Sequence, residues 1–442
     1  MPTLTIRRQI LRLAVPAFGA LIAEPLFLLA DSAIVGHLGV DQLAGVGLAS
    51  TVLQTAVGLL VFLAYSTTPA VARLLGAGRL PEALAVGRDG LWLAALLGIA
   101  LALAGTFWAA PVLAVLGAQR EVLQFAVEYL RFSMPGLPAM LLILAATGVL
   151  RGLQDTRTPL LVAGIGFAVN IVLNAVLVYG LQLSVAGSGL GTSLAQWGMA
   201  AVYLVIVLRR LRRHGVKIRP DWRGIRAVSK VGSWLMLRTL SLRAAIFATV
   251  LVATAQGPVN LAAHQVAMTI FTFLAFALDA LAIAAQALVG KELGASNLSS
   301  VRMLTRTMVL WGLGFGVLTS ALVLAVAQSI GWIFTPDHAV HAALAAALLI
   351  VALGQPVAAC VFVLDGVLIG AGDARYLALA GVVNLLLYLP LLAWVAAMDL
   401  DGFTGLLWLW TAFAGGYMLF RFVTLGLRAR SPHWMLVGAH RR

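Results

Sequence analysis

Long apolar runs recur along the whole chain and are separated by short polar segments. Twelve such runs cover residues 11–35, 44–71, 90–113, 122–149, 159–180, 190–208, 232–255, 261–288, 306–330, 341–370, 377–396 and 403–426. A helix of about 20 residues crosses a hydrocarbon core of roughly 30 Å. Open strands cannot satisfy their backbone groups in lipid, so each run predicts a helix. The expected fold class is an all-α integral membrane protein with twelve transmembrane helices.

Composition supports lipid as the main solvent. The chain has 442 residues, of which 62% are hydrophobic and 10% are charged, whereas soluble domains carry about 25% charged residues. The lone Cys360 lies inside an apolar run, so no intramolecular disulfide is expected. The charged tip and apolar run at the start resemble a signal peptide. That run continues past Glu24 for a full span without a cleavage site, which argues against one.

The basic residues set the expected orientation. The formal net charge is +14, and Lys and Arg gather at both ends of the chain and after every second apolar run. Arg120 is the one clear exception in the alternate loops. This positive-inside pattern predicts a multi-pass protein of the cell (inner) membrane with both termini in the cytoplasm. It explains the charge without nucleic acid as a partner, and it leaves anionic lipids as partners of the central basic segment.

The chain repeats itself at an offset of 218 residues. Residues 148–157 reappear as 366–375, and no gap is needed from about 43 to 157. Duplicated halves are a common design of transporters. Six spans per half give both halves the same sense in the membrane, which predicts two lobes related by a pseudo-two-fold axis along the membrane normal. The expected parts are an N-lobe at 1–208, a basic cytoplasmic linker at 209–230, a C-lobe at 231–427 and a cytoplasmic tail at 428–442.

Ionisable residues inside spans are costly and are candidates for function. Glu24 and Asp31 lie seven residues apart in the first span and therefore share a helix face. Pro25 predicts a bend between them. A bent helix with two carboxylates is a candidate for ion coupling. Simple hydration of Asp31 near the external surface is the alternative.

The eighth span carries a polar stripe with a seven-residue spacing, formed by Gln265, Thr272, Asp279 and Gln286. Such a stripe lines a cavity or a helix interface, because it cannot face lipid. We expect Gln286 to serve the interface and the other three to line a substrate cleft. Asp365 in the tenth span is a candidate for the same cleft or for a structural pairing.

Two arginines fall inside the seventh span. Both are candidates for the substrate cleft, and the alternative for Arg238 is that its side chain extends to the cytoplasmic surface. Arg243 lies deeper, and we expect Asp279 or Asp365 as its partner, because an unpaired arginine there would be expensive.

The remaining polar positions do not form an enzyme site. Asn170 and Asn174 share one face of the fifth span, where helix association is the alternative to a functional role. His264 has no second ligand in view, so no metal site is expected from it. The sequence has no nucleotide-binding motif, no metalloprotease motif and no cysteine cluster. We therefore expect neither an enzyme nor a cofactor, and an ion gradient as the energy source.

Three segments together resemble the MATE family (multidrug and toxic compound extrusion), and within it the DinF-type branch. Residues 23–39 resemble the first helix of the family, 262–282 the eighth and 364–373 the tenth. The resemblance runs from about residue 8 to 427. It implies a monomeric exporter with a central cleft between two lobes. Such an exporter exchanges external protons or sodium for amphipathic, often cationic, compounds by alternating access.

The resemblance also implies site residues. Asp31 matches the coupling aspartate of the first helix, and Asn170 and Asn174 match an Asn and an Asp of the fifth. The replacement of that Asp by Asn174 puts a site with two carboxylates in doubt and gives more weight to Asp31 and Glu24. No metal is expected apart from a sodium ion near Asp31.

Three alternatives stay open. A flippase for lipid-linked or other metabolites in the same superfamily would need a basic cleft. A major-facilitator transporter would need a Gly-x-x-x-Asp-Arg run after the second span, where Arg73 to Arg79 stands instead. A channel or receptor fits duplicated halves and buried carboxylates less well.

Overall fold

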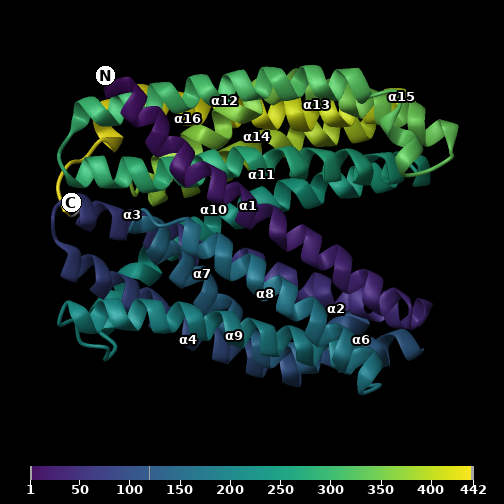
Figure 1. The fold of residues 1–442 in the computed structure, drawn as a ribbon. Helices are drawn as coiled ribbons and strands as arrows, with labels where there is room; N and C mark the ends of the chain where they lie inside the picture. The colour runs from purple at the N-terminus through teal and green to yellow at the C-terminus, as the bar shows by residue number, and fades with distance from the viewer. Residues whose placement is uncertain (1, 119, 440–442) are drawn as a thin grey trace. The chain divides into compact units, whose positions relative to one another are not determined.

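The computed structural model describes residues 2–118 and 120–439, and all regular secondary structure in this part of the chain is helical (Figure 1). Within these residues, twelve helices are long and apolar enough to cross a membrane, which confirms the twelve predicted spans. They are Ile6–Gly36, Val40–Gly76, Leu80–Phe107, Arg120–Gly152, Arg157–Gly180, Ser184–Arg213, Trp222–Ala255, Pro258–Gly294, Leu298–Val326, His338–Gly370, Ala374–Ala397 and Gly402–Arg430.

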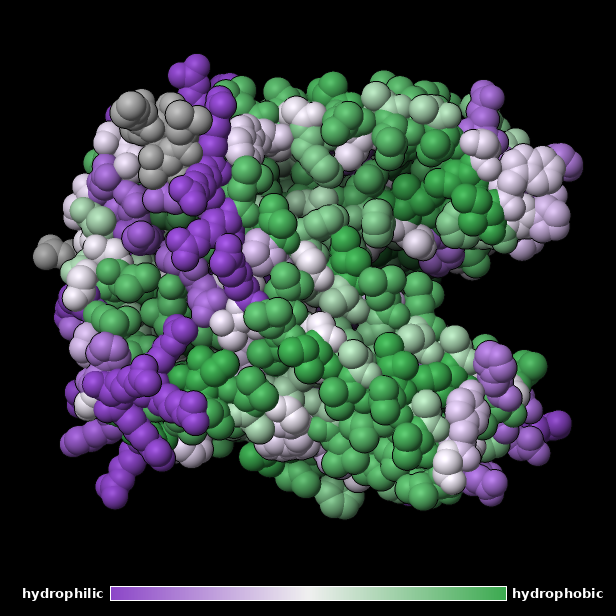
Figure 2. All heavy atoms as spheres, viewed as in Figure 1, coloured by the Kyte–Doolittle hydropathy of each residue, from purple (hydrophilic) through white to green (hydrophobic). Residues whose placement is uncertain are grey.

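Contacts divide the chain into two compact units. The first unit is Arg12–Gly232. The second unit contains the chain from Ser233 onward and also the first helical turns of the chain, up to Leu11. Helices α1 (Pro2–Gly36) and α10 (Trp222–Ala255) each pass through a boundary between the units. Figure 2 shows apolar side chains along the helix sides in both units and hydrophilic side chains at the helix ends. This distribution suits helices that face lipid.

The first unit is built around α7 (Leu137–Gly152), which packs against α3, α4 and α9. Its other elements are α2 (Val40–Leu59), α3 (Phe62–Gly76), α4 (Leu80–Phe107), α5 (Ala109–Val115), α6 (Arg120–Ser133), α8 (Arg157–Ala175) and α9 (Ser184–Arg213), with a 3-10 turn η1 (Met134–Gly136) and a π-helical segment η2 (Val176–Gly180). Helix α8 packs against α9, and α2 against α6.

The second unit is built around α13 (His338–Gly370), which packs against α11, α12 and α15. Its other elements are α11 (Pro258–Gly294), α12 (Leu298–Val326), α14 (Ala374–Ala397), α15 (Gly402–Trp410) and α16 (Met418–Arg430), with 3-10 turns η3 (Ile330–Ile333) and η5 (Pro432–Trp434) and a π-helical segment η4 (Thr411–Tyr417). Helices α11 to α14 and α16 run side by side in Figure 1.

The sequence repeat is also a repeat of helix ends. Helix α3 ends at Gly76 and α11 at Gly294, while α7 ends at Gly152 and α13 at Gly370. Both pairs differ by the offset of 218 residues that the sequence shows. The duplicated halves therefore stop their helices at matched positions.

The turns after these helices share a backbone conformation even where the residues differ. Gly78 has a φ of 74°, and its counterpart Ser296 has a φ of 58°. Gln154 has a φ of 64°, and its counterpart Gly372 has a φ of 72°. Only glycine adopts this left-handed region without strain. The repeated turn has thus kept its shape in both halves, although each half uses a non-glycine residue at one of the two turns.

The basic linker is mostly helical. Helix α9 continues to Arg213 and α10 begins at Trp222, so only 214–221 connect them. This connection is fixed to α4 within the first unit. Arg88 donates to the Lys217 carbonyl at 2.8 Å, and the Trp92 indole donates to the Ile218 carbonyl at 2.9 Å.

Candidate functional site

Asp31 is the centre of a buried polar cluster in the first unit. It lies on α1 with 4% of its surface exposed. Its Oδ1 accepts a hydrogen bond from Asn174 Nδ2 of α8 at 2.6 Å and another from Ser188 Oγ of α9 at 2.7 Å. A buried carboxylate is costly unless such donors replace water. The structure thus brings Asp31 and Asn174 together, as the resemblance to the family implied.

Two buried amide oxygens without partners lie on the helix that carries Asn174. In the part of the chain that the structure describes, Asn170 Oδ1 and Asn174 Oδ1 are buried and have no hydrogen-bond partner. They lie one turn apart on α8, and the Ser188 hydroxyl of α9 contacts the same carboxylate of Asp31. Buried polar atoms in native proteins normally have partners. Carboxylate, amide and hydroxyl oxygens are the ligands that hard cations prefer, so this set fits a sodium ion or a proton.

Small residues at the start of α9 allow the close approach. A Cβ at Gly191 would overlap Asn174 Oδ1, and Asn170 Nδ2 donates to the Gly191 carbonyl at 3.3 Å. Sequence reasoning missed Ser188. The Gly/Ser-rich stretch 184–193 was the available signal, because small residues mark close helix contacts in membranes.

Glu24 does not join this cluster. Its side chain is exposed, and no hydrogen bond or ion pair links it to another described residue. Helix α1 continues through Pro25. The buried Tyr129 of α6 lies close enough to Asp31 to interact with its charge, and this neighbour was not expected.

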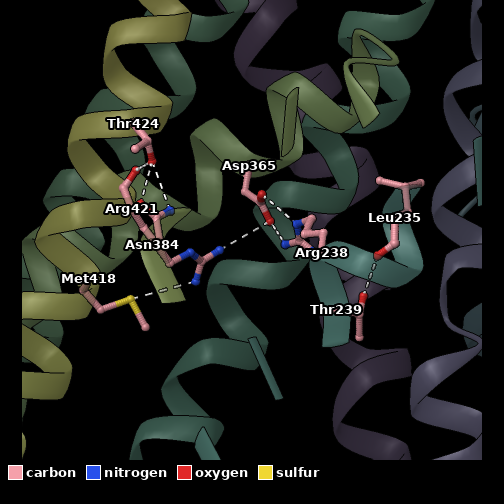
Figure 3. A network of polar contacts seen from close by, with 8 residues as sticks. All are labelled: Leu235, Arg238, Thr239, Asp365, Asn384, Met418, Arg421 and Thr424. Atoms are coloured by element: carbon pink, nitrogen blue, oxygen red, sulfur yellow. Dashed lines mark hydrogen bonds and ion pairs between the residues drawn. The ribbon is translucent and has the colours of Figure 1, made fainter. Parts of the chain in front are cut away.

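The second unit contains a cluster of charged side chains (Figure 3). Arg238 of α10 forms a bidentate ion pair with Asp365 of α13, and one of its contacts is a 3.0 Å hydrogen bond from Nε to Oδ1. Arg421 Nη2 of α16 lies 3.7 Å from Asp365 Oδ2. Nearby, Asn384 Nδ2 of α14 donates to Thr424 Oγ1 at 3.1 Å.

The expected pairing of Arg243 is wrong. Arg238, not Arg243, forms the ion pair with Asp365. Arg243 is exposed and has no ion-pair partner among residues 2–118 and 120–439. Five residues of helix correspond to a rotation of about 140°, so the two arginines point to different sides of α10. Arg421 was missed, although an arginine between Phe420 and Phe422 in a predicted span was a visible signal.

The polar stripe of α11 is not uniformly buried. Gln265 and Thr272 are exposed, Asp279 is partly buried and Gln286 is buried. Asp279 interacts electrostatically with Arg421. The stripe therefore begins at an exposed face of α11 and ends inside the second unit.

His264 lies in an aromatic environment in the second unit. It is 0% exposed, and its ring centroid lies 5.6 Å from that of Trp410. Neither ring nitrogen has a hydrogen-bond partner among the described residues. Within the same residues, no group of three or more His, Cys, Asp or Glu side chains could hold a metal ion.

Comparison with known proteins identifies the family. A model of the MatE family matches residues 16–176 and 236–394. Protein DETOXIFICATION 44, chloroplastic, of Arabidopsis thaliana is 30% identical over 397 residues, which are 85% of this chain and 74% of that protein. DNA damage-inducible protein F of Escherichia coli is 34% identical over 291 residues, which are 64% of this chain and 63% of that protein. Multidrug resistance protein MdtK of Edwardsiella ictaluri is 28% identical over 384 residues, which are 83% and 82% of the two chains.

Solved structures share the fold. A MOP superfamily transporter from Pyrococcus furiosus has a TM-score of 0.86 at 22% identity, over 96% of both chains. The Vibrio cholerae MATE transporter VcmN in its bent form has a TM-score of 0.86 at 20% identity, over 98% of this chain and 99% of that one. The chain therefore belongs to the MATE family, whose members are multi-pass membrane transporters and not enzymes.

Proposed function

We propose that this chain is a secondary active antiporter that exports amphipathic organic compounds, cationic drugs and toxic compounds among them, by alternating access. Protons or sodium ions that enter the cell would drive the export. In this proposal Asp31 is the coupling group and Asn170 and Asn174 support it. The exposed part of the α11 stripe, Gln265 and Thr272, faces the substrate path.

The observation that carries the proposal is the buried carboxylate of Asp31 beside Asn174, whose amide oxygen has no partner among the described residues. A low-dielectric site favours the neutral form of a carboxylic acid, so uptake or release of a proton changes the stability of the site strongly. A sodium ion would give the same kind of switch by filling the oxygen set. Coupling requires only that ion and substrate stabilise different conformations.

The proposal includes the membrane arrangement. Its parts are an N-lobe at 1–208, a linker at 209–230, a C-lobe at 231–427 and a tail at 428–442. Both termini, and with them the tail, lie in the cytoplasm. The positive-inside pattern supports this orientation in the cell membrane. The partners are the substrate, the coupling ion and membrane lipids, and the protein acts as a monomer.

Reconstitution tests the proposal. The purified full-length chain would be placed in liposomes with ethidium as a fluorescent cation, and a pH gradient or a sodium gradient would be imposed separately. We expect one of the two gradients to drive ethidium against its own gradient. Ion flux without any counter-substrate would indicate a channel and contradict the proposal.

A further inference from the structure

We propose that a groove along α6 in the first unit binds a phospholipid headgroup that carries both a phosphate and a primary ammonium group. This site gives a chemical class to the membrane lipids that the proposed function names as partners. Its leaflet rests on the orientation proposed above, whereas the binding itself can be tested without transport.

The groove runs along one face of α6 and has a volume of about 460 Å³. Sites for small molecules typically have volumes of roughly 300 to 1,000 Å³. Four polar residues with helical spacing line the groove, and they are Arg120, Gln124, Glu128 and Arg131. Phe132 and two aliphatic side chains complete it. The groove therefore offers charged and apolar contacts together, as an amphipathic ligand requires.

Glu128 and Arg131 are opposite charges inside a membrane-spanning segment. The segment is Arg120–Gly152, and the two side chains lie three residues apart on it, partly exposed and exposed. In the described part of the chain, no hydrogen bond or ion pair joins them to each other or to another residue. Charges inside a span are costly unless they are paired or solvated. A ligand with one negative and one positive group would compensate both.

The two charges lie at the depth of a lipid headgroup. The segment has 33 residues and is therefore about 50 Å long, which exceeds a hydrocarbon core of roughly 30 Å by about 20 Å. Glu128 and Arg131 follow the start of the helix by about 12 Å and about 16 Å, so they lie near the boundary between headgroups and hydrocarbon. Helical side chains lean toward the N-terminus, and a long arginine extends further that way. Both charged groups therefore point back toward the headgroups.

The order of the two charges along the helix indicates which lipid fits. In an ethanolamine phospholipid the phosphate lies next to the glycerol and the acyl chains, and the ammonium lies further out. From the middle of the span toward its outer end, α6 presents Phe132, then Arg131, then Glu128. A phosphate matches the planar fork of Arg131, and the ammonium donates to the carboxylate of Glu128. Phe132 is 43% exposed and is placed to contact the acyl chains.

The far end of the same span assigns the leaflet. Arg151 and Arg157 flank its end at Gly152, which the positive-inside pattern places in the cytoplasm. Helix α6 then belongs to the outer leaflet, where Arg120 is the exception to that pattern. A lipid phosphate beside Arg120 and Arg131 accounts for basic residues on this side of the membrane.

Calorimetry tests the binding without a gradient. Full-length protein in a nonionic detergent would be titrated with three dihexanoyl phospholipids, whose headgroups are phosphoethanolamine, phosphocholine and phosphoglycerol. We expect the ethanolamine lipid to bind about tenfold more tightly than either of the others. The reason is that the choline group has no N–H donors for Glu128, and the glycerol group has no positive charge.

Variants assign the binding to the groove. Glu128→Gln should remove the preference for the ethanolamine lipid, and Arg131→Gln should weaken the binding of all three lipids about tenfold. Two matched changes of exposed residues outside the groove, Glu121→Gln on α6 and Arg306→Gln on α12, should bind like the wild type.

Three results would overturn the inference. They are equal affinities for the three lipids, tighter binding of the phosphoglycerol lipid, and a preference for the ethanolamine lipid that Glu128→Gln leaves unchanged. If a variant does not fold, the order of the three affinities on the wild-type protein decides. None of these outcomes affects gradient-driven antiport, which the liposome experiment measures separately.

Discussion

Asn174 on α8 donates a 2.6 Å hydrogen bond to Asp31 on α1, so an amide and not a second carboxylate stands beside the buried acid. The amide stabilises the charged form of Asp31 through its N–H group. Its oxygen stays without a partner in the described part of the chain. One carboxylate with one adjacent amide therefore defines the chemistry of the first unit.

Replacement of this amide by an acid should change the pH dependence of export. In Asn174→Asp, two carboxylates would lie at hydrogen-bond distance, and like charges this close share a proton. We expect the variant to continue export at a higher external pH than the wild type, measured as initial rates in liposomes across external pH. Gln328→Glu, which changes an exposed amide far along the chain from this pair, is the control and should keep the wild-type profile. An unchanged profile in Asn174→Asp would contradict proton coupling at this pair.

The ion pair of Arg238 and Asp365 should show strong coupling in stability. Arg238→Met leaves Asp365 buried with Arg421 3.7 Å away, and loss of one partner of a buried pair costs about 3 kcal/mol. The double variant Arg238→Met with Asp365→Leu should recover much of that loss, because both charges are gone. Unfolding in mixed detergent micelles measures the stability of the wild type, both single variants and the double variant. Arg243→Met should be nearly neutral, since Arg243 is exposed. If the loss of stability in the double variant equals the sum of the losses in the two single variants, Arg238 and Asp365 do not interact.

The buried imidazole of His264 should be dispensable for folding. Neither ring nitrogen has a hydrogen-bond partner among the described residues, so an apolar side chain of similar size loses no bond there. We expect His264→Leu to change the free energy of unfolding by less than about 1 kcal/mol. Thr249→Val is the contrast, because it removes a 2.6 Å hydrogen bond to Tyr388 and should cost about 1 to 2 kcal/mol. Thermal melting in detergent compares them. A larger loss for His264→Leu than for Thr249→Val would mean that the imidazole has a partner.

Much of the fold follows from the sequence because span length is a strong constraint. The apolar runs located the twelve membrane-spanning helices of the described residues, and the offset of the repeat equals the spacing of the helix ends that the structure shows at Gly76 and Gly294. The predicted positions of the helix ends were less accurate. Helix α10 begins at Trp222, ten residues before the predicted run at 232, because polar residues continue the helix beyond the apolar part.

The site was only partly predictable. Asp31 and Asn174 could be named because ionisable and amide groups inside spans are rare and costly. Ser188 and the pairing of Arg238 depend on which helix faces are in contact, and helical spacing within one span does not contain that information. Arg421 could have been named by the same criterion as Asp31.

A turn shared by the two halves predicts a stabilising change. Ser296 has a φ of 58°, and its counterpart in the first half is Gly78. Ser296→Gly should raise the free energy of unfolding by about 0.5 to 1 kcal/mol, because relief of the left-handed strain exceeds the added freedom of the unfolded chain. Ser299→Gly, inside the first turn of α12, should lower it by about 0.5 kcal/mol. Chemical unfolding of both variants measures this. If both variants changed the free energy of unfolding in the same direction, the account of the turn would be contradicted.

The central claim is that Asp31 couples ion movement to export. In Asp31→Asn the new side chain still offers an oxygen to Asn174 and Ser188, so the fold should survive. The amide cannot gain or lose a proton, and it brings no charge to a sodium ion. Asp41→Asn, an exposed acid in the first turn of α2, is the matched control and should export normally.

The most direct measurement is therefore gradient-driven ethidium export in liposomes that contain wild type, Asp31→Asn or Asp41→Asn at equal protein content, with melting temperatures recorded for all three. The account predicts that Asp31→Asn melts near the wild-type temperature and exports no faster than empty liposomes. Full export by a folded Asp31→Asn protein would contradict it.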